Sequence, residues 1–139
     1  MTPTLLGRWQ TRLFMLFLVG GLTTLPFYYI NDGNPIFFWI LFYVAVFGLG
    51  WDIVYHLIQQ SLWDGDWPGV LQFASAVIEG VFLALIWANL GLPRVPQTAF
   101  QWEWFVAHYS AVWLVTFLLS WVIMRILFPR WRFRGGQWL

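Results

Sequence analysis

Long apolar stretches alternate with short polar ones along this chain. About 20 helical residues, each rising 1.5 Å, match the roughly 30 Å hydrocarbon core of a bilayer. The pattern therefore predicts an all-α integral membrane protein with four transmembrane helices. We place the spans at about residues 10–30, 36–60, 68–92 and 100–128.

The connections between the spans are too short to form a soluble domain of their own. We therefore expect one four-helix transmembrane domain over residues 1–139, arranged as an antiparallel bundle. The first span starts after arginines, as a signal peptide does, but it continues into Phe27 without a small-residue cleavage site. We expect it to be retained and to be kinked or ended near Pro26.

The arginines predict the orientation, because basic residues near membrane spans remain in the cytoplasm. The loops on the opposite side from the chain ends hold only Arg94. The arginines at the two ends are Arg8, Arg12, Arg125, Arg130, Arg132 and Arg134. Both termini are therefore expected to be cytoplasmic, and the membrane is expected to be a prokaryotic inner membrane.

Composition supports a lipid environment. The 139 residues are 60% hydrophobic and 9% charged, and the mean hydropathy is +0.68. A soluble domain of this size would need more charged residues on its surface. The main partner is therefore expected to be the lipid bilayer. The net charge of +1 argues against nucleic acid, and the lack of cysteine removes disulfides and thiolate metal sites. Other membrane subunits or a second copy of the chain remain as partners.

Several polar side chains fall inside the predicted spans, where an ionisable group costs about 2.5–3.5 kcal/mol and normally faces a partner within the bundle. Counted along the helices, four of them form a ladder through the bilayer: His108, Glu79, Asp52 and His56. The predicted polar core consists of Asp52, His56, Glu79, His108, Gln59, Ser75 and Arg125. Within it, Arg125 would complete the ladder by pairing with Asp52.

Two interpretations of this ladder remain open. In one, the His and carboxylate groups carry protons or an ion across the membrane. In the other, they tie the helices together and never change state. Asp52, His56 and Glu79 are also candidate ligands for a divalent metal, although the spacing lacks the paired motifs of known helical metal sites. We expect no cofactor, with a divalent metal as the alternative, and we leave the catalytic residues unassigned.

Two further features concern packing and surface contacts. Small residues recur every four positions on the third span, at Ala76, Gly80, Ala84 and Ala88, and predict close helix packing. Within the basic-aromatic tail at residues 129–139, an extended backbone would present its arginines on one side. The tail residues predicted to contact lipid or a partner are Arg130, Trp131, Arg132 and Arg134.

These observations favour a small accessory, scaffold or assembly subunit of a larger membrane system rather than an enzyme. The alternative is an ion- or proton-conducting component that uses the polar ladder. A metal-dependent membrane enzyme is the third hypothesis.

Overall fold

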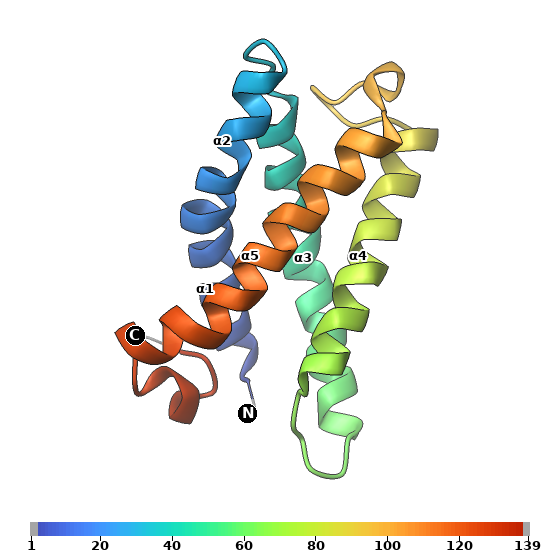
Figure 1. Ribbon diagram of the computed structural model, residues 1–139. Helices are drawn as coiled ribbons and strands as arrows, with labels where there is room; N and C mark the ends of the chain where they lie inside the picture. Colours follow the sequence, from blue (N-terminus) through green and yellow to red (C-terminus); the bar gives the residue numbers. More distant parts are fainter. Residues whose placement is uncertain (1–2, 138–139) are drawn as a thin grey trace.

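The computed structural model describes residues 3–137, apart from the side chain of Arg132, and this part of the chain is helical (Figure 1). The only β pairing among these residues is an isolated bridge between Leu92 and Val95. The elements are α1 (Leu5–Met15), the π-helix η1 (Leu16–Gly20), α2 (Gly21–Ile30), α3 (Ile36–Ser61), α4 (Gly69–Asn89), the 3₁₀-helix η2 (Gln97–Ala99), α5 (Trp102–Leu127) and the 3₁₀-helix η3 (Trp131–Arg134).

Within residues 3–137, four helical segments are long and apolar enough to cross a membrane. They are Leu5–Ile30, which joins α1, η1 and α2, then α3, α4 and α5. This confirms the predicted number of apolar helices and identifies the chain as a multi-pass membrane protein. The first segment begins earlier than predicted, because the Thr4 hydroxyl caps α1 by accepting a hydrogen bond from the Gly7 N–H at 3.1 Å. It also continues through Pro26 to Ile30, which is the predicted end of the span, so of the two alternatives at this proline the helix does not end there.

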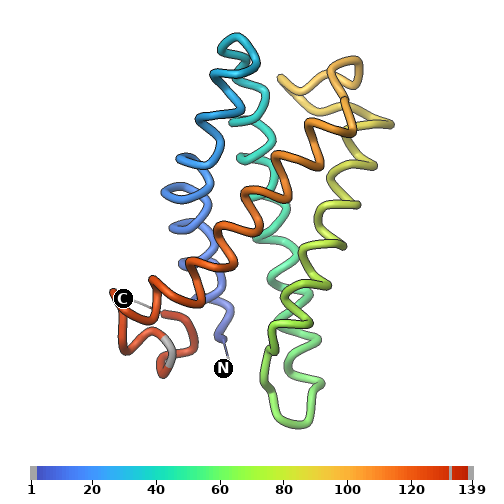
Figure 2. The backbone as a smooth tube through the Cα atoms, in the orientation of Figure 1, coloured from blue at the N-terminus to red at the C-terminus, as the bar shows by residue number. Residues whose placement is uncertain are grey.

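The helices lie side by side, and their connections alternate between the two ends of the bundle (Figure 2). The α3–α4 link lies at the same end as the start of α1 and the end of α5. We call this the terminal end. The α2–α3 turn and the α4–α5 connection lie at the other end. Helix α5 crosses obliquely from α4 towards α1, so α4 and α5 separate near the terminal end (Figure 1).

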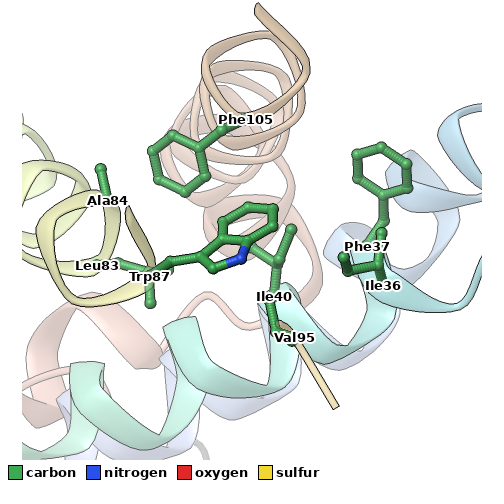
Figure 3. Packing of buried hydrophobic residues seen from close by; sticks show 8 residues of the cluster. All are labelled: Ile36, Phe37, Ile40, Leu83, Ala84, Trp87, Val95 and Phe105. Carbon is green, nitrogen blue, oxygen red and sulfur yellow. The ribbon is translucent and has the colours of Figure 1, made fainter. Parts of the chain in front are cut away.

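The largest apolar core lies away from the terminal end and joins α3, α4 and α5 (Figure 3). Its buried members are Ile36, Phe37, Ile40, Leu83, Ala84, Trp87, Val95 and Phe105. The α4–α5 connection closes this core, because Val95 is fully buried and the Trp87 indole N–H donates to the Pro96 carbonyl at 3.0 Å. Outside the core, large apolar side chains such as Phe17, which is 87% exposed, cover the helices. That surface suits lipid contact rather than water.

The small-residue stripe on α4 packs within the bundle. Ala76, Gly80 and Ala84 are buried and Ala88 is half-buried. A Cβ atom at Gly80 would lie 2.8 Å from the Tyr109 ring, and the Tyr109 hydroxyl donates to the Ala76 carbonyl at 2.7 Å. The stripe therefore lets the aromatic side chain of α5 approach the backbone of α4 closely.

The tail folds back on α1 and does not have the extended backbone that would present its arginines on one side. The Thr4 N–H donates to the Gly135 carbonyl at 2.7 Å, and the Thr11 hydroxyl donates to the Gly136 carbonyl at 3.1 Å. Trp131 was predicted to contact lipid or a partner, but it is only 7% exposed and packs against Met15. The only polar atom of its indole is the N–H, which donates to the Thr11 hydroxyl at 2.9 Å. Burial therefore leaves no polar atom of this side chain unpaired.

Arg130 and Arg134 remain exposed on η3, as their predicted role requires. The side chain of Arg132 lies outside the described part of the chain, so its predicted contact is not tested.

Candidate functional site

The most polar point of the interior is one guanidinium held between two carboxylates. Arg12 donates from Nε and Nη2 to the two carboxylate oxygens of Asp52, both at 2.8 Å. It also donates from Nη1 and Nη2 to the carboxylate of Glu79, at 2.7 and 2.9 Å. Both contacts are therefore bidentate, which is the strongest geometry for an arginine–carboxylate pair. We call this group the Arg12 cluster.

Three helices supply the Arg12 cluster: Arg12 comes from the last turn of α1, Asp52 from α3 and Glu79 from α4. The side chains of Asp52 and Glu79 are 4% and 9% exposed, and that of Arg12 is 19% exposed. Gly48, one turn before Asp52, makes room for the arginine. A Cβ atom there would clash with the guanidinium, with 2.7 Å to Cζ.

A second arginine extends the polar region towards the terminal end. Arg8 lies one turn before Arg12, donates to Gln59 Oε1 at 2.7 Å, and stacks over the Trp67 ring at 4.4 Å. The amide of buried Gln59 in turn donates to the Gly65 carbonyl at 2.8 Å. This chain of contacts joins α1, the end of α3 and the α3–α4 link.

The predicted ladder does not form. Asp52 and Glu79 share one guanidinium and so lie at the same level rather than on successive rungs. Arg125 does not pair with Asp52, because it is exposed near the end of α5 and lies over the Trp121 ring at 4.6 Å. The place predicted for Arg125 is taken by Arg12.

The two histidines lie apart from the Arg12 cluster in their hydrogen bonding. His56 is half-buried, and its Nε2 lies 3.2 Å from the Gln60 amide nitrogen within α3. His108 is 1% exposed, and its Nε2 lies 2.9 Å from the Thr24 hydroxyl oxygen. The Thr24 hydroxyl donates its one proton to the Gly20 carbonyl at 2.7 Å, so it must accept from His108 Nε2–H. The other ring nitrogen of His108, Nδ1, has no hydrogen-bond partner.

Aromatic rings surround the other faces of His108. The ring centroids of Phe27 and Phe37 each lie 5.1 Å from the centroid of the imidazole. Ser75, the remaining member of the predicted polar core, donates its hydroxyl to the Gln72 carbonyl at 2.8 Å and so bonds within its own helix α4.

The three candidate metal ligands do not assemble into one site. No group of three or more His, Cys, Asp or Glu residues is placed to hold a metal ion among residues 3–137. The guanidinium of Arg12 occupies the space between Asp52 and Glu79 and uses their oxygens as acceptors. His56 lies outside this arrangement, bonded along its own helix.

A cavity of about 370 Å³ lies beside the Arg12 cluster, between α1, α3, α4 and α5. Arg12, Asp52 and Glu79 form part of its wall, and the tyrosine and tryptophan side chains of α5 form another part. Its volume falls within the roughly 300–1,000 Å³ of ligand pockets. Arg8 also lines the cavity, so two arginines and two carboxylates balance the charge of its polar wall, which faces an aromatic one.

Sequence reasoning missed the central residue of this site. Arg12 was assigned to the basic residues that flank the first span and set its orientation, although the predicted span of residues 10–30 includes it. The useful signal was the four-residue spacing of Arg8 and Arg12, which places both on one face of a helix that extends upstream. Two carboxylates inside the membrane require a cation, and that requirement already pointed to an arginine from another span.

Fold and site thus define the class: a multi-pass helical membrane protein with an ion-paired interior. Comparison with protein-family models, curated proteins and solved structures gave no significant match to the chain.

The space around the Arg12 guanidinium gives a first prediction. Gly48→Ala should lower the melting temperature of the detergent-solubilised protein, because the added methyl group displaces Arg12 from its carboxylates. We expect a loss of about 1–3 kcal/mol, typical of overpacking in a filled interior. Gly50→Ala is the matched control on the same helix, since a Cβ atom there meets nothing within 4 Å. Equal melting temperatures for the two variants would contradict this account.

The Thr24–His108 hydrogen bond gives a second prediction. Thr24→Val should lower stability by about 1–3 kcal/mol, because it leaves the buried His108 Nε2–H without an acceptor. Thr23→Val is the control, since Thr23 also donates to the carbonyl four residues earlier, at 2.8 Å, whereas the imidazole bonds to Thr24. Thermal unfolding in detergent compares the two. A larger loss at Thr23 than at Thr24 would show that the hydroxyl does not serve the histidine.

Proposed function

We propose that this protein is a small non-catalytic accessory, scaffold or assembly subunit of a larger membrane system. The observation that carries the proposal is the Arg12 cluster, in which four short hydrogen bonds fix both intramembrane carboxylates to one guanidinium. A group that carries protons or ions must exchange partners during turnover. Carboxylates held bidentately by an internal cation instead serve to join α1, α3 and α4.

The proposed arrangement is an antiparallel bundle in a prokaryotic inner membrane, with both termini on the cytoplasmic side. The short connections, which alternate between the two ends of the bundle, support the antiparallel order. Exposed arginines support the orientation, because Arg125, Arg130 and Arg134 all lie at the terminal end, whereas Arg94 is the arginine of the opposite loops.

Contact with a partner would use surfaces that the chain does not cover itself. The small-residue stripe is occupied by Tyr109, so it is not available for this purpose. η3 presents Arg130, Arg134 and the 84% exposed ring of Phe133 beside the membrane. Such a basic and aromatic surface suits an acidic segment of a neighbouring membrane subunit.

The second candidate is an ion- or proton-conducting component. The observation in its favour is the cavity, whose wall includes both carboxylates and His108. Conduction would require the Arg12 cluster to open, since Asp52 and Glu79 are otherwise occupied.

Two measurements test the proposal. In native membranes solubilised in mild detergent, a tagged chain should migrate in an assembly larger than the purified chain, and Arg130→Gln/Arg134→Gln should release it. Arg94→Gln, at the opposite end, should leave the assembly intact. In liposomes, the purified protein should give no proton or ion flux above that of empty liposomes.

A free chain in native membranes would contradict the subunit role. Flux that Glu79→Gln abolishes, without loss of helical signal, would establish the second candidate instead.

A further inference from the structure

The cavity beside the Arg12 cluster changes in character along its length. Arg125, in the last turn of α5, and Trp67, in the α3–α4 link, line it near the terminal end. Further along, its lining includes Leu16, Leu41 and Val112, which form a separate apolar cluster. One end of the cavity is thus charged and aromatic, and the other end combines these apolar side chains with His108 and Tyr109.

Aromatic side chains of α5 close the gap where α4 and α5 separate. The rings of Trp113 and Phe117 stack with centroids 5.0 Å apart, and Trp121 follows at 6.1 Å from Phe117. Trp121 also reaches α4, since a Cβ atom at Gly69 would lie 3.6 Å from its ring. These rings give the cavity an apolar wall on the α5 side.

Charge is unbalanced at the α5 side of the terminal end. Among residues 3–137, salt bridges join Arg12 to Asp52 and to Glu79. Arg125, Arg130 and Arg134 are exposed there, while Asp66 lines the cavity from the α3–α4 link, on the α4 side. The Arg12 cluster and Arg8 contribute two positive and two negative charges, so they leave no local excess. An anionic group is therefore favoured beside Arg125.

The dimensions match one lipid leaflet. From Arg125 to Val112 is 13 residues along α5, or about 20 Å, which corresponds to a headgroup region plus one leaflet of about 15 Å. We propose that the cavity holds one anionic lipid, with its headgroup at Arg125 and one acyl chain extending towards Leu16, Leu41 and Val112.

This proposal is independent of the accessory role, since a lipid site suits either a subunit or a conducting component. In this proposal Arg125 contacts the lipid headgroup, and the aromatic rings of α5 contact the acyl chain. The polar side chains Gln72 and Ser75 line the cavity between these regions, at a depth suited to the ester groups of the lipid.

Native mass spectrometry of the delipidated full chain tests the proposal, with phosphatidylglycerol or phosphatidylcholine of identical acyl chains added. We expect saturable binding of one phosphatidylglycerol per chain and several-fold weaker binding of phosphatidylcholine. Arg125→Gln should weaken phosphatidylglycerol binding about fivefold, the effect of removing one basic contact at a membrane surface. Arg94→Gln is the matched control, because Arg94 also lies over a tryptophan ring, that of Trp39, but outside the cavity.

A second pair of variants tests whether the acyl chain of the lipid occupies the cavity. Ser120→Phe fills the cavity and should abolish one-to-one binding of both lipids. Ser110→Phe makes the same change at an exposed position of α5 that does not line the cavity, and it should bind as the unmodified chain does. If Ser120→Phe does not fold, as judged by its helical signal, the Arg125 and Arg94 pair alone decides. Non-saturable binding, equal binding of the two lipids, or equal losses in Arg125→Gln and Arg94→Gln would overturn the proposal.

Discussion

A guanidinium between two carboxylates in the apolar interior constrains the rest of this structure. Removing Arg12 would leave two buried carboxylates without their cation, and breaking a buried ion pair in this way typically costs about 3–5 kcal/mol. Because Arg12, Asp52 and Glu79 come from α1, α3 and α4, their contacts fix these three helices to one another at a single level. Two local features accommodate the buried guanidinium. Gly48 leaves space for it, and α1 begins at Leu5, so that Arg12 lies on a helix inside the bundle.

Helix α5 is held differently. It has no charged contact with the Arg12 cluster and instead packs through Tyr109 on α4, through His108 on Thr24 of α2, and through the apolar core at Phe105. Its terminal half departs from α4, and aromatic rings rather than backbone packing bridge the separation. A cavity therefore remains beside the polar wall instead of a filled helix interface. Three rigidly joined helices and one oblique helix thus provide both a structural centre and a space for a ligand.

The sequence predicted the helices well because long apolar runs have few alternatives in lipid. It also identified Asp52 and Glu79 as interior groups, and both are buried. Their partner was not predicted, because residue spacing along one helix does not show which side chain of another helix reaches it. Arg125 was chosen as the partner of Asp52 and Arg12 was counted only as a flanking charge, whereas in the structure Arg12 makes that contact. The folded tail was missed for a similar reason: Trp131 and two glycine carbonyls find partners on α1, more than 100 residues away in sequence.

The most direct test of the central role of Arg12 is a double-mutant cycle between Arg12 and Glu79, measured as unfolding free energy in mild detergent. Arg12→Gln, Glu79→Gln and the double variant supply the cycle. The structure predicts a favourable coupling energy above about 1.5 kcal/mol, as found for close charge pairs. Additive effects, with a coupling energy near zero, would contradict the claim that this ion pair holds α1 to α4.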